Sequence, residues 1–151
     1  MAANAAANTR RRLILASRLE DLALVTPWVG ALAAEYAIPA ETEFAIHLCL
    51  EEAISNIVRH GYREQSKQLI TVDFALSPTG GMEFRIEDHG PPFDPLDPSL
   101  IATAPAPASI EEIPLGGRGL RLMRKFAGNL AYERLADANR LTIGFPLRHG
   151  A

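Results

Sequence analysis

Seven of the eleven prolines lie between residues 91 and 114, and this cluster limits the fold more than any other feature of the chain. Proline fixes its own φ angle and has no backbone N–H, so a segment this rich in proline cannot be a regular helix or a central strand. We therefore expect a long loop that divides the chain into two ordered parts. Loops of this length inside small domains usually have a function of their own.

The size and composition of the chain indicate one soluble globular domain. It has 151 residues, 48% of them hydrophobic and 22% charged. It has no apolar run of the roughly 18 to 20 residues that cross a bilayer and no apolar signal-peptide core, so we expect a cytoplasmic protein without a membrane partner. We expect a flexible tail at 1–11, one domain at 12–147 and a short tail at 148–151.

Cysteine content and net charge exclude several classes of site. The single cysteine, Cys49, excludes an intramolecular disulfide and a cysteine-based zinc cluster, and it fits a small buried hydrophobic position. The net charge of -3 provides no general attraction for nucleic acid, so we expect no direct nucleic-acid partner.

Before the proline-rich segment, apolar periodicity predicts a strand at 12–17 and a helix within 21–36 that begins or kinks near Pro27. A second helix begins after Pro39 and runs to about His60, where Gly61 provides a stop. Two strands follow at 69–76 and 82–88, and residues 78–81 form the hairpin turn between them.

After the proline-rich segment, glycines at 116, 117 and 119 open a helix that ends at Gly128, and two strands follow at 129–134 and 140–146. This order predicts a two-layer α/β sandwich, in which a mostly antiparallel, mixed sheet packs one apolar face on the helices. It does not follow the regular strand and helix alternation of a Rossmann domain.

The helix that begins after Pro39 has an apolar arc and two polar stripes. The apolar arc should face the sheet, and it consists of Ile46, Leu50, Ala53, Ile54 and Ile57. One polar stripe should face water, and it consists of Glu43, His47, Glu51 and Ser55. Glu52 and Asn56 instead lie one turn apart at the edge of the core, where a pocket can form. They are either site residues or ordinary polar residues at the boundary of the core.

Asp88 is the second candidate. It follows the parity of Met82, Phe84 and Ile86, so its carboxylate should point toward the core at the end of a strand. A carboxylate in that position needs a donor. The donor is either the backbone of the turn at Gly90 or the amino group of a ligand, such as the exocyclic amine of adenine.

The third candidate is the glycine-rich start of the helix at 116–119. Glycines let a ligand approach the backbone, and the free N–H groups of a helix start attract phosphate, with Arg118 and Arg121 available for charge-assisted bonds. The same glycines can also make only a tight connection. The segment is neither a Walker A loop nor a dinucleotide-binding fingerprint.

Together and in this order, the three segments resemble the N, G1 and G2 boxes of the GHKL ATPases. The local strings EEAISNIVRHGY, EDHGPPFDP and GGRGLRLMRKFAGNLAYER are similar to those of the anti-sigma-factor serine/threonine kinases and their stand-alone relatives. The resemblance covers about residues 12–147. It implies the Bergerat ATP-binding fold, with ATP and Mg²⁺ as cofactors and a loop at about 91–115 as the ATP lid.

The resemblance also assigns roles to individual residues. It implies that Asn56 binds Mg²⁺, that Glu52 is the general base and that Asp88 accepts a hydrogen bond from the adenine amine. Further nucleotide-binding residues implied by it are Gly90, Gly117, Arg118, Gly119 and Leu120, with Thr142 as a weaker candidate beside the adenine. His60 is left out of the catalytic set because a histidine at a helix end is more often structural.

One position departs from the superfamily pattern. Pro92 stands where many GHKL proteins have a second glycine in the G1 box. The pair Pro91 and Pro92 removes two amide donors and stiffens the start of the lid, so nucleotide affinity or lid motion can differ from the wider superfamily. The short single-domain relatives have a similar string.

The resemblance implies a Mg²⁺- and ATP-dependent serine/threonine kinase that phosphorylates an anti-anti-sigma partner with a STAS domain and regulates a sigma factor by partner switching. A homodimer is expected by the same resemblance. The alternative is a non-catalytic module that binds protein partners under the control of ATP. A plain structural α/β domain would require all three boxes to be coincidental.

Overall fold

The computed structural model describes residues 10–61, 68–78, 80–97 and 115–146. Its strands form one sheet in the order β1-β2-β3-β5-β4, and all four of its pairings are antiparallel. The strands are β1 (Arg10–Ala16), β2 (Leu69–Leu76), β3 (Met82–Asp88), β4 (Asn129–Arg134) and β5 (Asn139–Phe145). The predicted sandwich is confirmed. The described sheet is antiparallel throughout, rather than mixed.

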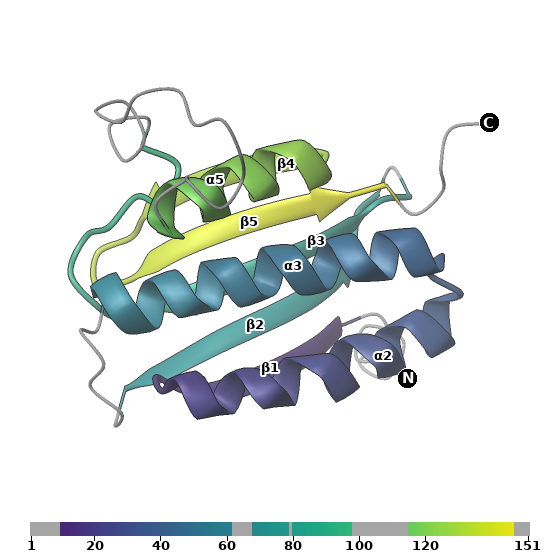
Figure 1. The fold of residues 1–151 in the computed structure, drawn as a ribbon, viewed down its shortest axis with the longest axis horizontal. Helices are drawn as coiled ribbons and strands as arrows, with labels where there is room; N and C mark the ends of the chain where they lie inside the picture. Colours follow the sequence, from purple (N-terminus) through teal and green to yellow (C-terminus); the bar gives the residue numbers. More distant parts are fainter. Residues whose placement is uncertain (1–9, 62–67, 79, 98–114, 147–151) are drawn as a thin grey trace.

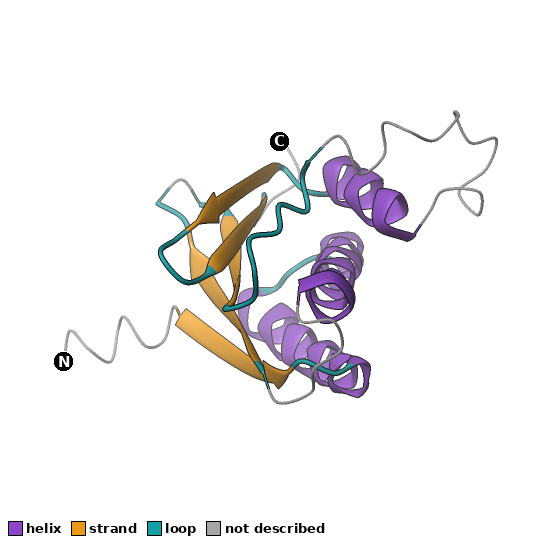
Figure 2. Ribbon diagram, turned by 90° about the vertical axis from the view of Figure 1, so that its left-hand side faces the viewer, coloured by secondary structure: helices purple, strands orange, loops and turns teal. Residues whose placement is uncertain are grey.

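The α-helices of the described residues cover one face of this sheet, as Figures 1 and 2 show. They are α2 (Val25–Tyr36), α3 (Ala40–Asn56) and α5 (Leu115–Phe126), and α3 packs between the other two. A 3-10 helix, η1 (Leu19–Leu24), precedes α2, and a π-helical turn, η2 (Ile57–Gly61), follows α3. Within the described residues no helix combines the length and the apolar character needed to span a membrane.

The first strand begins earlier than predicted, at Arg10. Arg10 and Arg11, assigned to the tail by the sequence, belong to β1 because they pair with Ala75 and Phe74 of β2. The predicted helix start near Pro27 is confirmed, since α2 begins at Val25 and Pro27 lies in its first turn, where the backbone N–H groups have no helical partners. Residue 79 of the predicted hairpin turn lies outside the described residues.

The α3 helix ends earlier than predicted and continues as a different helix. Regular α-helix stops at Asn56, and residues 57–61 form the π-helical turn instead of extending α3 to His60. Turns of this kind are frequent at functional sites because they change the direction of neighbouring side chains. Asn56 is the last α-helical residue before this change.

Alternation along the strands separates a buried face from an exposed one. Val72, Phe74, Phe84 and Ile86 are buried beneath the helices, against the predicted apolar arc of α3. The opposite face carries cross-strand ion pairs, with 2.7 Å between Arg12 Nε and Asp73 Oδ1 and 2.6 Å between Arg140 Nε and Glu87 Oε1. Parity along a strand therefore decides whether a side chain can reach the helix layer.

Two glycines should respond to alanine in opposite directions. An added Cβ meets no atom within 4 Å at Gly30 of α2 or at Gly80 of the β2–β3 hairpin, but Gly80 has a φ of +91°. Gly30→Ala should stabilise the protein by about 0.5–1 kcal/mol, because alanine is the better helix former. Gly80→Ala should destabilise it by about 1 kcal/mol or more, because a Cβ is strained at positive φ. Urea unfolding measures both, and shifts of the same sign would contradict the assigned backbone.

Candidate functional site

The end of α3, the end of β3 and the start of β5 lie at the same end of the molecule (Figure 1). Residues of all three elements line a cavity there. It contains about 270 Å³ of empty space, including the part open to solvent. Its lining residues are Ala53, Asn56, Ile57, Ile86, Asp88, Phe93, Pro95, Tyr132, Asn139 and Leu141. The lining is apolar apart from a few polar groups, as in sites that bind a flat base.

Asp88 is the acidic residue of the cavity, and its side chain is buried, with 3% exposed. Its Oδ1 accepts hydrogen bonds from the Gly90 N–H at 2.9 Å and from Asn139 Nδ2 at 3.0 Å. Its Oδ2 forms no hydrogen bond to another described residue. The turn role considered from the sequence is therefore confirmed for Oδ1. The role of Asp88 as an acceptor for a ligand amine stays a prediction.

Asn139 lies beside Asp88, and we call these two residues the polar corner of the cavity. The sequence analysis missed Asn139. It lies directly opposite Asp88 in the β3–β5 register, and 4% of it is exposed. The predicted strand began one residue later, at Arg140. Asn139 nevertheless has the parity of the inward residues Leu141 and Ile143, so a longer predicted strand would have found it.

Tyr132 of β4 is a second lining residue that sequence reasoning missed. Its hydroxyl donates to Asn139 Oδ1 at 2.5 Å. Burial raises the pKa of Tyr132, so the hydroxyl keeps its proton at neutral pH and remains a donor. The inward parity of Leu130 and Tyr132 on β4 was the available signal.

Residues 90–97, the first part of the predicted lid, form a defined turn. The Gly90 carbonyl accepts from Arg134 Nη1 at 2.8 Å, and the Phe93 N–H donates to Asn139 Oδ1 at 3.2 Å. Farther along, the Leu96 carbonyl accepts from Arg124 Nη2 of α5 at 3.3 Å. Pro95 is buried in the cavity wall, while Pro91 and Pro92 are exposed. The remainder of the predicted lid, residues 98–114, lies outside the described residues.

Asn56 enters the same cavity from the helix layer. Only 6% of it is exposed, and its side-chain amide forms no hydrogen bond within the described part of the chain. A buried amide oxygen without a partner is a suitable hard ligand for Mg²⁺, which also takes phosphate and water oxygens. No group of three His, Cys, Asp or Glu side chains that could hold a metal is found among the described residues.

Glu52 lies one turn before Asn56 on α3, is half-buried and does not line the cavity. Glu51 is exposed, as predicted. Ser55, predicted to face water with Glu51, is instead buried, and its hydroxyl donates to the Glu52 carbonyl at 3.2 Å. The prediction considered only the packing of α3 against the sheet. It was wrong because α5 also packs against α3 and covers part of the face that would otherwise be in water.

Cys49 lies one turn before Ala53 of the cavity wall and is fully buried. Burial raises the pKa of its thiol to about 12, and the charge of Glu52 contributes to the same shift. The thiol is therefore neutral at physiological pH, which confirms the small buried hydrophobe expected from the sequence.

The glycine-rich segment does open a helix, since Gly117, Arg118 and Gly119 lie in the first turns of α5. Their side-chain surroundings are outside what the structure describes, so their predicted role in phosphate binding stays a prediction. Leu120 is completely buried. Thr142 is not brought to the cavity, because it has the parity of Arg140 and pairs with Arg85 and Ala131 on the face away from the helices.

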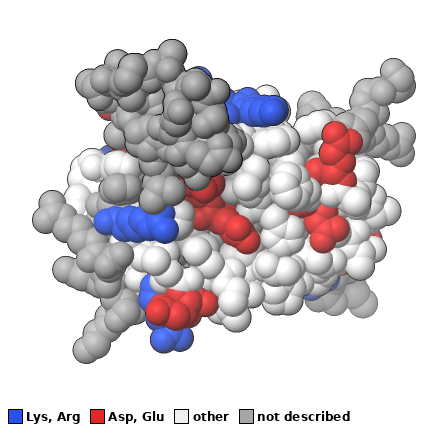
Figure 3. Space-filling view, viewed as in Figure 1, with Lys and Arg blue, Asp and Glu red and all other residues white. Residues whose placement is uncertain are grey.

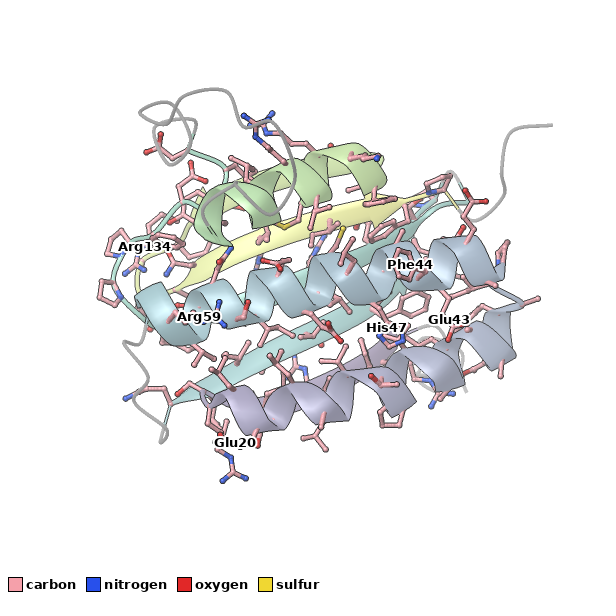
Figure 4. The ribbon with its side chains drawn as sticks, viewed as in Figure 1. Glu20, Glu43, Phe44, His47, Arg59 and Arg134 are labelled. Atoms are coloured by element: carbon pink, nitrogen blue, oxygen red, sulfur yellow. The ribbon has the colours of Figure 1, made fainter. Side chains whose placement is uncertain are left out.

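Charged groups surround the site unevenly. Figure 4 shows Arg59 and Arg134 toward the end of the molecule where α3 ends, whereas Glu43, Phe44 and His47 lie toward the other end. Figure 3 shows acidic side chains over the middle of α3, where Glu51 is exposed and Glu52 half-buried.

Comparisons with known proteins place the site in a family. The model for the histidine kinase-like ATPase domain matches residues 15–145. The serine/threonine-protein kinase BtrW of Bordetella bronchiseptica is 30% identical over 116 residues, which are 77% of this chain and 79% of that kinase. The residues matched by the family model include the ends of α3 and β3 and the whole of β5.

Solved structures share the fold. The RsbU and RsbW domains of Rv1364c from Mycobacterium tuberculosis match 94% of this chain with a TM-score of 0.65 and 18% identity. The histidine kinase domain of the Erythrobacter litoralis EL346 blue-light activated histidine kinase matches 85% with a TM-score of 0.53 and 18% identity. This chain covers 33% and 60% of those chains. The chain belongs to the histidine kinase-like ATPase domain family, which confirms the resemblance to the GHKL ATPases.

Proposed function

We propose that this protein is a Mg²⁺- and ATP-dependent serine/threonine kinase of the anti-sigma-factor type. Its substrate is an anti-anti-sigma partner with a STAS domain, and it regulates a sigma factor by partner switching. The observation that carries the proposal is the pair Asn56 and Asp88. These two buried polar side chains line one cavity, and each keeps an oxygen without a partner among the described residues.

Family membership implies that ATP is used, and the cavity suits its base. Ile86, Leu141 and Phe93 provide apolar surface for a flat ring, and the Asp88 Oδ2 provides an acceptor for an exocyclic amine. A buried carboxylate oxygen without a donor is costly, so a ligand amine that satisfies it gains both affinity and orientation. The similarity to BtrW, a serine/threonine kinase, supports a hydroxyl as the phosphoryl acceptor.

The remaining roles follow from position along α3 and α5. Asn56 would hold Mg²⁺, which neutralises charge on the triphosphate when bound. Glu52 would accept the proton of the attacking serine or threonine hydroxyl, while the γ-phosphoryl group moves to that oxygen and ADP leaves. The first N–H groups of α5, near Gly117 and Gly119, would receive phosphate oxygens, with Arg118 adding charge. The proposal includes a homodimer and a cytoplasmic location.

The second candidate is a binding module that closes on ATP and performs no phosphoryl transfer. It is favoured by the position of Glu52, which does not line the cavity. The exposed pair Pro91 and Pro92, which lacks two amide donors, is consistent with altered nucleotide contacts. Under this alternative Glu52 has no role in chemistry, and partner binding depends on ATP alone.

The adjacent glutamates separate these two functions. Glu52→Gln should reduce phosphorylation of a STAS partner by about 100-fold or more, because a general base contributes 10²–10⁴-fold. It should leave ATP affinity close to that of the wild type. Labelled ATP and phosphosite mapping on the partner provide the measurement.

Glu51→Gln is the matched control, since Glu51 is exposed and one residue earlier on the same helix. It should retain both binding and transfer. Equal partner phosphorylation by the wild type and Glu52→Gln would remove Glu52 as the base. ATP-dependent capture of the partner without any transfer by the wild type would favour the binding module.

Asn56→Ala should weaken ATP binding only when Mg²⁺ is present. Removing the amide oxygen removes one ligand of the metal, so calorimetric affinity with Mg²⁺ should fall roughly 10-fold, while affinity in EDTA should stay near the wild-type value. The free energy of unfolding should fall by no more than about 1 kcal/mol, because this amide has no hydrogen bond to lose among the described residues. Equal loss with and without Mg²⁺ would contradict a metal role.

A further inference from the structure

Asn139 is a buried amide at the first position of β5, and every hydrogen-bonding site on its side chain is used. Its Nδ2 donates to Asp88 Oδ1 at 3.0 Å and to the Pro91 carbonyl at 2.9 Å. Its Oδ1 accepts from the Phe93 N–H at 3.2 Å and from the Tyr132 hydroxyl at 2.5 Å. An amide has two N–H donors and two lone pairs, so the group is fully satisfied by β3, β4 and the 90–93 turn.

This arrangement fixes the orientation of the Asp88 carboxylate. Two donors, the Gly90 N–H and Asn139 Nδ2, bind the same oxygen, Oδ1. A rotation of the carboxylate away from this plane would break both bonds in a buried place, where an unmade bond to a charged group costs most. The other oxygen, Oδ2, therefore keeps one position relative to the cavity. The same amide fixes the Pro91 carbonyl and the Phe93 N–H beside it.

We propose that Asn139 is a positioning residue that determines the base preference of the cavity by holding Asp88 and the 90–93 turn in place. A fixed carboxylate oxygen accepts from the 6-amino group of adenine and repels the 6-oxygen of guanine, which is an acceptor. Discrimination by a rigid acceptor is greater than by a mobile one, because a mobile carboxylate can turn away from the wrong base. The inference rests on the proposed nucleotide binding and extends it to specificity.

Asn139→Asp tests this with almost no change of shape. The new side chain keeps an oxygen for the Phe93 N–H and the Tyr132 hydroxyl, but it places a second acceptor 3.0 Å from Asp88 Oδ1 and opposite the Pro91 carbonyl. Repulsion should displace the Asp88 carboxylate. Calorimetry with MgATP and MgGTP should give at least 10-fold weaker ATP binding, a smaller loss for GTP and therefore a reduced ATP-to-GTP preference.

Two further variants make the result interpretable. Tyr132→Phe removes only the hydroxyl that binds Asn139 Oδ1, so it should reduce the ATP-to-GTP preference in the same direction by a smaller factor, about two- to five-fold. Glu133→Gln changes the next residue of β4, which is exposed, and should bind both nucleotides like the wild type. Circular dichroism and thermal unfolding report whether each variant is folded.

Each outcome bears on the proposal. A reduced preference in folded Asn139→Asp supports it. An unchanged ATP-to-GTP preference, or an equal loss of affinity for both nucleotides, overturns it. A residue that only stabilised the fold would weaken the binding of both nucleotides equally. If Asn139→Asp does not fold, Tyr132→Phe decides in the same way. Wild-type protein that binds neither nucleotide would instead contradict the proposed function, and this failure is visible before any variant is measured.

Discussion

The whole structure depends on a sheet that buries only one of its faces. Side chains alternate along each strand, so the helix layer receives every second residue and solvent receives the others. On β3 this rule buries Phe84 and Ile86 and leaves Arg85 exposed. At the end of the same strand it directs Asp88 inward, past the last apolar residue. The polar corner of the cavity is thus a continuation of the core, with its position set by the same register.

Burying polar groups at this corner is tolerated because most of their hydrogen bonds are made. Asn139 satisfies Asp88, the 90–93 turn and Tyr132 together, whereas one carboxylate oxygen of Asp88 and the amide of Asn56 keep capacity that no described residue fills. Such groups destabilise a folded protein unless a ligand pairs with them. A ligand that pairs with both groups would offset this cost, as the proposed nucleotide site requires.

The proline-rich segment, which limits the fold more than any other sequence feature, connects the polar corner of the cavity to the start of α5. Its described part, residues 90–97, is held by Asn139, Arg134 and Arg124, side chains that come from three different elements. The proposed kinase would use this firm anchor to place the base, and the start of α5 to receive the phosphates. Proline is compatible with this turn because the bonds use carbonyl groups at 90, 91 and 96 rather than the N–H groups that Pro91 and Pro92 lack.

The sequence by itself determined the order and type of the elements, the inward side of β2, β3 and α3, and the candidates Asn56 and Asp88, because these depend on local periodicity. It did not show Asn139 or Tyr132 at the site, the buried state of Ser55 or the π-helical turn after Asn56. Those depend on strand register and helix packing: Asn139 matters because residue 139 stands opposite residue 88, a pairing across 51 positions of the chain. Thr142 shows the same limit, since only the register of β5 places it on the face away from the cavity. Local patterns fix which way a side chain points, whereas only tertiary pairing fixes what it meets.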